Sequence, residues 1–491
     1  MTRTKRKIKI LLVLILVFNV LLRLPSLFDP VSYGDECIYL TLGNAFNRGL
    51  VFYRDIHDNK PPLLYFFAAL AQGRQFYFRL ITIIWNTVNV WLIYKLAKLL
   101  LQKEKAGLVA ALLFVFFSLL PEGRIANGEI FMIMPATLGV FISLKGFQKK
   151  KDLYFFLAGF CFSLGFLFKV PAVLEFMGFI LALFVFTKLN LVFNKRKPAL
   201  ILGLLKDKRF VLLLTSFFLP ILLSIIYYWT QNASTPYIRS ALLQNIGYLS
   251  SWAGASKGLY QRLVILLLVG GLIYSWHKRL TLPYFLPALM FLFGLYGVFL
   301  SERPYPHYFM QVAPWAALLL TVTFWLRKKE HLIITFILLF LGFAGVIKFD
   351  FWWYSHLPYY RNFLRFARGE ITRQQYFAFF GTKVLNDYQI AKYLKAHTKP
   401  DQPVFIWGDG ACIYTLSGRL PSGRYTVNYH IYDFNGYKET LKAIEEKRTP
   451  TIVMLESAQE RFPQLESLLA IDYVLVRQIG KAEVYQRLIS E

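Results

Sequence analysis

The first long hydrophilic loop of the chain carries residue types that suit chemistry on a charged substrate. It contains the acid pair Asp35-Glu36, a predicted helix over residues 38–48, and Lys60 followed by two prolines. A carboxylate can accept a proton from a hydroxyl group, and a lysine ammonium can bind a phosphate oxygen. The loop therefore places a potential base and a potential anion ligand on the two sides of one short helix.

The same spacing also fits a purely structural interpretation. Asp35 is a good N-cap for the predicted helix, and Glu36 would interact favourably with the positive end of the helix dipole. The two prolines after Lys60 would begin the next helix. The two interpretations are compatible, because a capping residue can also be a carboxylate that is held in place for catalysis.

Further along the chain, other charged residues stand at the ends of predicted helices. Glu129 opens one helix, Lys169 lies in a short turn between two apolar runs, and His307-Tyr308 follows a third run. Glu129 could be a first-turn dipole partner, and a single histidine at a helix end is often only a hydrogen-bonding residue. Taken together, the carboxylates and cations predict a site for an anionic headgroup at the surface of a bilayer.

Apolar segments that must position these residues occupy most of the chain. Of its 491 residues, 56% are hydrophobic, and the mean hydropathy is +0.44, which excludes an ordinary soluble domain. A helix that spans a bilayer needs about 20 apolar residues, and we expect about eleven such helices. The predicted spans are 8–28, 78–100, 106–121, 129–147, 153–168, 171–187, 209–229, 260–276, 281–300, 306–326 and 331–349. The first run lacks a small-residue cleavage site, so we interpret it as a retained helix.

The net charge of +28 is arranged by loop, which argues against a nucleic-acid partner. Lysine and arginine gather at every second connection, the pattern of cytoplasmic loops. These basic connections are Arg3 to Lys9, Lys103 to Lys105, Lys149 to Lys151, Lys195 to Arg209, Lys278 to Arg279 and Arg327 to Lys329. The amino terminus is then cytoplasmic, and the outward segments are 29–77, 122–128, 169–171, 230–259, 301–305 and everything after about residue 350.

A change of pattern after residue 349 marks a domain boundary. We expect a transmembrane domain over 1–349 with its outward loop at 29–77, an interfacial connector over 350–382, and an α/β domain over 383–491. The predicted helices of the last domain are Lys383 to His397, Tyr437 to Lys447 and Ala458 to Leu469. Its predicted strands are Val404 to Trp407, Thr451 to Leu455, Tyr473 to Gln478 and Glu483 to Gln486. The three cysteines, Cys37, Cys161 and Cys412, are scattered and predict neither a disulfide framework nor a metal cluster.

These motifs resemble those of glycosyltransferase family 39, membrane enzymes of the GT-C fold that include protein O-mannosyltransferases and lipid A aminoarabinose transferases. The resemblance covers about the first 330 residues in order and topology. The positions that carry it are the acid pair Asp35-Glu36, Lys60 to Tyr65, Asn127-Gly128-Glu129, and His307-Tyr308 with Pro314.

The resemblance implies a fold and a reaction. The fold that it implies is an all-α polytopic GT-C-like membrane protein, to which the residue pattern adds the small carboxy-terminal α/β extracytoplasmic domain, for which the family offers no matched equivalent. The reaction moves a hexose or pentose from a polyprenyl-phosphate donor to a protein, lipid or glycan acceptor, with inversion, at a bacterial or archaeal plasma membrane. It implies Asp35 as the base, with Glu36 and Glu129 as orienting carboxylates. Lys60, Lys169, His307 and Tyr308 would bind the donor phosphate.

Two departures limit what the resemblance implies. Many relatives have an acid directly before Lys-Pro-Pro, where this chain has Asn59, so the metal requirement stays open. The second-loop acid is usually aspartate, whereas Glu129 is one methylene longer. No soluble cofactor is implied, although a divalent metal is compatible with the family.

Two other classes of protein remain as alternatives. A lipid or solute transporter or flippase would also be polytopic, but transporters place ionisable residues near the bilayer midplane and are often built from two related halves. A membrane sensor would bind its ligand in the carboxy-terminal domain. Eleven spans exceed what an anchor needs, and the loop acids would then have no role.

Overall fold

The computed structural model describes residues 3–193, 207–244, 256–458 and 461–488. The chain divides into two compact units, which we describe separately. Unit 1 comprises residues 1–24, 82–226 and 242–354. Unit 2 comprises residues 25–81, 227–241 and 355–491.

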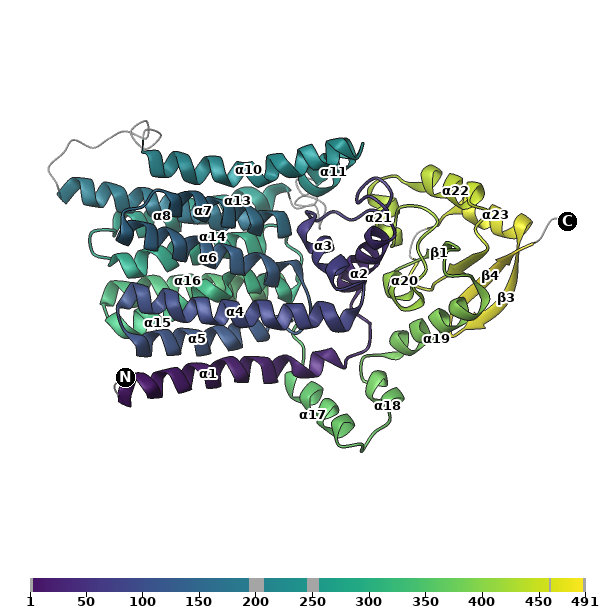
Figure 1. Cartoon of the computed structure of the whole chain (residues 1–491), viewed down its shortest axis with the longest axis horizontal. Coiled ribbons are helices and arrows are strands. Elements are labelled where there is room, and N and C mark those ends of the chain that lie inside the picture. Colours follow the sequence, from purple (N-terminus) through teal and green to yellow (C-terminus); the bar gives the residue numbers. More distant parts are fainter. Residues whose placement is uncertain (1–2, 194–206, 245–255, 459–460, 489–491) are drawn as a thin grey trace. The chain divides into compact units, whose positions relative to one another are not determined.

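Every one of the eleven predicted spans corresponds to a helix. In Figure 1 the long helices of unit 1 run side by side. They are α1 (Arg3–Arg23), α4 (Gln75–Leu101), α5 (Glu104–Leu119), α6 (Gly128–Lys149), α7 (Leu153–Phe168), α8 (Ala172–Phe193), α10 (Lys208–Thr230), α13 (Ser256–Ser275), α14 (Leu282–Phe299), α15 (Ala313–Leu326) with the preceding turn η3 (Pro306–Val312), and α16 (Lys329–Lys348). The basic residues 195–206 lie outside the described residues.

Within the described residues, eight helices are long and apolar enough to cross a membrane. Two more, Leu153–Phe168 and Ala172–Val185, are apolar but shorter, and α5 has 16 residues. The turn around Lys169 separates α7 from α8, so the predicted division into two helices is confirmed, although α8, with 22 residues, is longer than predicted. The chain is a multi-pass membrane protein.

Small residues allow the helices of unit 1 to approach closely. A Cβ atom on Gly159 of α7 would lie 2.1 Å from the carbonyl oxygen of Leu213 in α10. A Cβ atom on Gly139 of α6 would lie 2.9 Å from the ring of Phe162 in α7. In a lipid environment, where the hydrophobic effect does not drive helices together, such close packing is a main source of association.

A small mixed sheet forms the centre of the carboxy-terminal part of unit 2. Among the described residues it has four strands in the order β1-β2-β4-β3. The parallel pair is β1 (Val404–Trp407) with β2 (Thr451–Met454), and β4 (Ala482–Arg487) pairs antiparallel with both β2 and β3 (Tyr473–Ile479). All four predicted strands are confirmed, with bounds that agree to within one residue.

Helices cover the two faces of this sheet. On one face Ile390 and Leu394 of α19 (Thr382–His397) pack with Ile406, and on the other Phe462 packs against Trp407. The remaining helices are α20 (Ala411–Ser417), α21 (Asn428–Asp433), α22 (Tyr437–Glu446) and α23 (Pro463–Asp472). The predicted helices did not include α20 or α21, and the predicted start at Ala458 lies several residues before α23 begins.

The first outward loop also belongs to unit 2. It contains α2 (Gly34–Asn47) and α3 (Leu63–Leu70), preceded by the turn η1 (Leu24–Leu27). The connector forms α17 (His356–Ala367) and α18 (Arg373–Ala378), and the 227–241 segment contributes α11 (Ser234–Tyr237) and the start of η2 (Ile238–Leu243). Because α2 begins at Gly34 with Tyr33 at its N-cap, Asp35 lies in the first turn, and the predicted N-cap role of Asp35 is wrong.

A disulfide joins the first loop to the α/β domain, which corrects the prediction that the cysteines form none. Cys37 of α2 bonds Cys412 of α20, with the two Cα atoms 4.8 Å apart. Thr415 of α20 also donates a hydrogen bond to the carbonyl oxygen of Cys37 at 2.9 Å. The residues are 375 positions apart, so sequence proximity gave no sign of the pair. Cys161 is the remaining cysteine, and it is buried with a free thiol.

Removal of the disulfide should destabilise unit 2. We expect Cys37→Ser with Cys412→Ser to lower the stability by about 2–5 kcal/mol, because the bond closes a very long loop. Thermal unfolding in lipid or detergent measures the loss. Cys161→Ser is the matched control and should leave the transition within a few degrees. Labelling of denatured, unreduced wild-type protein with a thiol reagent should report one thiol; three thiols would contradict the bond.

Candidate functional site

Asp35 and Lys60, which the sequence analysis paired across the first loop, lie next to one another. The Lys60 ammonium is 3.6 Å from Asp35 Oδ2 and 3.7 Å from Asp58 Oδ2. It also lies over the ring of Tyr39, 5.0 Å from the centroid. The Asp35 side chain retains 31% of its exposure, whereas that of Asp58 is fully buried. Asp35 is therefore a partly exposed carboxylate beside a cation that other residues hold in position.

Asp58 is the fixed point of this cluster, although the sequence analysis did not select it. Its Oδ1 accepts a hydrogen bond from the backbone N–H of Asn59 at 2.8 Å, and its Oδ2 accepts one from the Tyr65 hydroxyl at 2.9 Å. Burial raises the pKa of Tyr65 well above its usual value, and the Asp58 charge adds to the shift. Tyr65 therefore remains a neutral donor to the buried carboxylate.

The α/β domain contributes a histidine to the same cluster. His430 of α21 places its Nε2 atom 3.6 Å from Asp58 Oδ1, and its ring lies 5.3 Å from that of His57. Burial lowers the pKa of His430 to about 4, more than the neighbouring carboxylates raise it. Burial likewise lowers the pKa of His57 well below its usual range. Both imidazoles are thus neutral at physiological pH.

Glu36, the other member of the acid pair, faces a different partner. It is fully buried and receives hydrogen bonds from the Arg79 guanidinium, at 2.9 Å from Nε and 2.6 Å from Nη2. Arg79 also donates to Asp29 at 3.2 Å and to the carbonyl oxygen of Ser26 at 2.7 Å. This geometry favours a structural role, and the catalytic role of Glu36 stays a prediction.

Asp29 extends the network to the connector. Its carboxylate accepts hydrogen bonds from the hydroxyl groups of Tyr359 in α17, at 3.0 Å, and Tyr376 in α18, at 2.6 Å. Burial raises the pKa of Tyr376 above its usual value, so its hydroxyl stays protonated and keeps donating. Through Asp29, both short helices of the connector are bonded to the beginning of the first loop.

In unit 1, all four of the other predicted residues come together. Lys169, in the α7–α8 turn, forms an ion pair with Glu129 of α6. Its ammonium lies over the Tyr308 ring at 4.6 Å from the centroid. His307 places Nε2 3.8 Å from Glu129 and Nδ1 2.6 Å from Glu122, which the sequence analysis did not select. Residues from three separate loops therefore form one charged cluster.

This cluster lies at the wall of a largely apolar cavity. The cavity has a volume of about 240 Å³ and is lined by Glu129, Lys169 and Tyr308 together with apolar side chains such as Met132 and Leu174. A cation next to an apolar wall suits a ligand that joins a phosphate to a hydrocarbon chain. Among the described residues, no group of three or more His, Cys, Asp or Glu side chains is placed to hold a metal ion.

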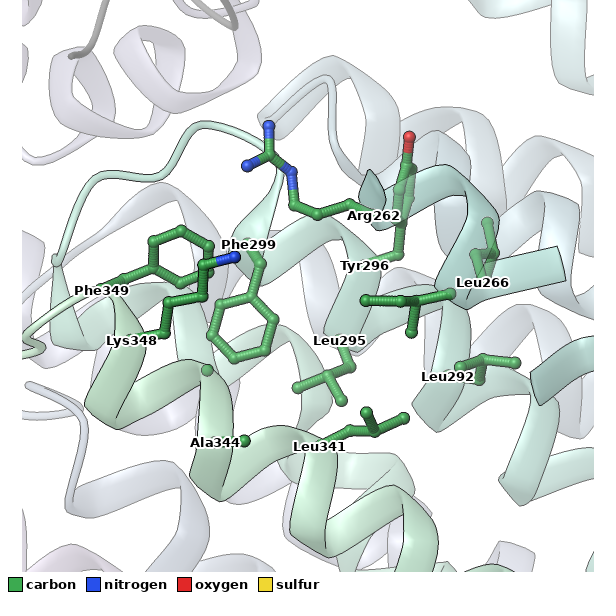
Figure 2. A pocket seen from close by; sticks show the side chains of 12 residues that line it. Arg262, Leu266, Leu292, Leu295, Tyr296, Phe299, Leu341, Ala344, Lys348 and Phe349 are labelled. Carbon is green, nitrogen blue, oxygen red and sulfur yellow. The ribbon is translucent and has the colours of Figure 1, made fainter. Parts of the chain in front are cut away.

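A second cavity in unit 1, of about 150 Å³, has a different lining. Figure 2 shows leucine side chains along it and Lys348 close to the Phe349 ring. The guanidinium of Arg262, at one side, forms an ion pair with Glu302. The residues that line this cavity include none of those predicted for the site, so we place no chemistry there.

Comparisons with known proteins agree with these observations. Residues 59–206 match the family of dolichyl-phosphate-mannose-protein mannosyltransferases, which confirms the predicted resemblance to GT-C membrane glycosyltransferases. No curated protein matches the sequence.

Among solved structures, ArnT from Cupriavidus metallidurans in the apo state matches at a TM-score of 0.53 and 12% identity, over 96% of this chain and 97% of that one. The same protein bound to undecaprenyl phosphate matches at a TM-score of 0.52 and 12% identity, over 97% and 98%. The archaeal oligosaccharyltransferase AglB from Archaeoglobus fulgidus matches at a TM-score of 0.46 and 12% identity, over 97% of this chain and 74% of that one. The fold of this chain is thus the ArnT-like GT-C fold, as predicted.

The buried pair of Glu36 and Arg79 generates a stability prediction. Glu36→Gln should cost about 3–5 kcal/mol, because it leaves a buried guanidinium without its full counter-charge. Asp55→Asn is the matched control in the same loop. Asp55 pairs with Arg54 at a more exposed site, so its replacement should cost at most about 1 kcal/mol.

Thermal unfolding of the two variants in the same detergent measures the difference. Equal unfolding temperatures for Glu36→Gln and wild type would show that the ion pair between Glu36 and Arg79 contributes little to the stability of unit 2.

Proposed function

We propose that this chain, whose residues 59–206 match the dolichyl-phosphate-mannose-protein mannosyltransferases and whose fold is that of ArnT, is a membrane glycosyltransferase that uses a polyprenyl-phosphate-linked sugar. The observation that carries the proposal is the cavity in unit 1. It combines an apolar wall with Lys169, a cation for a phosphate group. A lipid-linked donor has both parts, whereas a nucleotide sugar lacks the hydrocarbon chain.

The residues around Asp35 and Lys60 and those around Glu129 and Lys169 would have separate roles in the reaction. Lys169, with His307 and Tyr308 beside it, would bind the phosphate while the cavity wall contacts the isoprenoid. Glu129 holds the Lys169 ammonium before the donor binds and gives it up, in part, to the phosphate oxygens. Because phosphate is already a good leaving group, a cation that stabilises its charge is more useful than an acid.

Asp35 would act as the general base. It accepts the proton of an acceptor hydroxyl as that oxygen forms a bond to the anomeric carbon. The bond between the anomeric carbon and the phosphate oxygen breaks, and polyprenyl phosphate leaves with the electron pair. The product has inverted configuration. Lys60 stabilises the ionised form of Asp35, and we retain it as an additional phosphate ligand of the proposal.

The orientation of the chain is part of the proposal. The basic connections support a cytoplasmic amino terminus, with the first loop and the α/β domain on the outer side. The disulfide between Cys37 and Cys412 supports the same arrangement, because such bonds persist in oxidising compartments. We propose a bacterial or archaeal plasma membrane, a hexose or pentose as the transferred sugar, and an acceptor among the proteins, lipids or glycans of the cell envelope.

The central test is transfer from a panel of labelled polyprenyl-phosphate monosaccharides by purified protein in lipid vesicles. We expect wild type to release sugar from one member, and Asp35→Asn to lower the rate by about 10²–10⁴-fold, since a general base contributes that much. Asp55→Asn in the same loop should retain the wild-type rate. Full activity of a folded Asp35→Asn variant would exclude Asp35 as the base, and tight donor binding without turnover in wild type would favour a lipid transporter.

The donor-binding role of Lys169 has a separate test. Lys169→Met should weaken donor binding by about 10–100-fold, the usual loss for a hydrogen bond to a charged group, with a smaller effect on kcat. Lys149→Met, at an exposed position at the end of α6, is the matched control. Donor affinity is measured by displacement of a labelled polyprenyl phosphate. An unchanged affinity would remove Lys169 from the phosphate site.

A further inference from the structure

One short helix of the α/β domain places a histidine beside the charged groups of the first loop. His430 lies in α21, a six-residue helix, and its side chain is buried. Its Nε2 atom faces Asp58 Oδ1 at 3.6 Å. Its Nδ1 atom is buried and has no hydrogen-bond partner among the described residues. The imidazole is thus held by burial, with one nitrogen directed at a carboxylate.

The charged groups around His430 define what its ring can do. Asp58 and Lys60 come from the end of the first loop, Asp35 comes from α2, and the neutral ring of His57 lies beside it. Two carboxylates and one ammonium leave this group with one net negative charge. A neutral imidazole with its proton on Nε2 directs the positive end of an N–H dipole at Asp58, which stabilises the buried carboxylate.

Asp58 in turn determines where the Lys60 ammonium lies. Lys60 is placed between Asp58 at 3.7 Å and Asp35 at 3.6 Å. If Asp58 moved, the ammonium would lose one of the ion pairs that hold it and would keep its contact with the Tyr39 ring. His430 of the α/β domain adds to the contacts of Asn59 and Tyr65 that hold Asp58, and through Asp58 it bears on the position of the cation beside Asp35.

We propose that His430 is a positioning residue for glycosyl transfer, which acts on Asp35 through Asp58 and Lys60. The proposal rests on the proposed function, with Asp35 as the base. It gives the α/β domain a direct part in the reaction, whereas a domain that only covered the loop would need no polar group at this position.

Burial keeps the His430 imidazole neutral. Burial lowers the pKa of His430 to about 4, so protonation occurs only in acid. An imidazolium would compete with Lys60 for Asp58. The neutral ring leaves the ammonium as the main counter-charge of both carboxylates.

The test compares His430→Gln with His430→Leu. Glutamine places its amide N–H close to the position of the imidazole Nε2, whereas leucine fills the space without a donor. We expect His430→Leu to lower kcat by about 10–100-fold, because small displacements of catalytic groups cost that much. The donor KM should rise by a smaller factor, because Lys60 is only an additional phosphate ligand beside Lys169. His430→Gln should retain at least about half of the wild-type kcat.

The pH dependence separates positioning from loss of folding. In His430→Leu the acidic limb of the kcat/KM profile should move to higher pH by about half a unit to one unit, since a displaced ammonium stabilises the Asp35 carboxylate less. Misfolding would lower the amount of active enzyme without moving the limb. His397→Leu, at an exposed histidine of the same domain, is the matched control and should leave both kcat and the limb unchanged.

The outcomes distinguish this inference from the function on which it rests. Absence of transfer by wild type from every donor in the panel would overturn the proposed function. Transfer by wild type with an equal kcat and pH profile for His430→Leu would overturn only the role of His430. If His430→Leu loses the Cys37–Cys412 bond or its thermal unfolding transition, the activity of His430→Asn is compared with that of His430→Gln instead. Its shorter amide cannot reach Asp58, so activity equal to that of His430→Gln would also overturn the proposal.

Discussion

The arrangement of unit 2 depends on the hydrogen bonds and ion pairs of the buried Arg79 guanidinium. A charge in that environment is stable only if its hydrogen bonds and counter-charges are complete. Glu36, Asp29 and the Ser26 carbonyl oxygen supply them from the first turn of α2 and from the segment before it. Because Glu36 is adjacent to Asp35 in α2, the ion pair that holds Glu36 in place also limits the position of Asp35. The acid pair thus divides into a buried anchor and an accessible carboxylate.

The same segment is held from the other direction by covalent and polar contacts. Cys37, one residue after Glu36, bonds to Cys412 of the α/β domain, and Asp29 accepts hydrogen bonds from the connector. Three neighbouring positions of α2 therefore differ in their surroundings, because Asp35 is partly exposed, Glu36 is held by a buried ion pair and Cys37 is bonded covalently. If Asp35 is the base, as proposed, these contacts on both sides of it would hold its carboxylate in the position that catalysis needs.

Local patterns predicted most of the fold but only part of the site. The eleven helical segments and the strand Val404–Trp407 follow from apolar length and from runs of β-forming residues, which are properties of neighbouring residues. The contact between Asp58 and His430 joins segments far apart in the chain, and α21 is too short and polar to produce a helical period. For the disulfide a signal did exist. Cys37 and Cys412 both fall in segments predicted to face outward, while Cys161 lies in a span.

Within their respective units, Lys60 and Lys169 have the same kind of surroundings. Each ammonium contacts a carboxylate and lies over a tyrosine ring, that of Tyr39 or Tyr308. A lysine side chain has many rotamers, and the carboxylate and the ring select one of them before a substrate arrives. The carboxylate also balances the charge, so the folded protein does not retain a partly buried cation without a counter-ion. In the proposed reaction the donor phosphodiester carries one negative charge and the released polyprenyl phosphate carries up to two, so the ammonium would interact more strongly with the leaving group than with the donor. The two lysines are thus oriented by the fold itself, and in the proposed reaction this orientation would supply the preorganised charge that electrostatic catalysis requires.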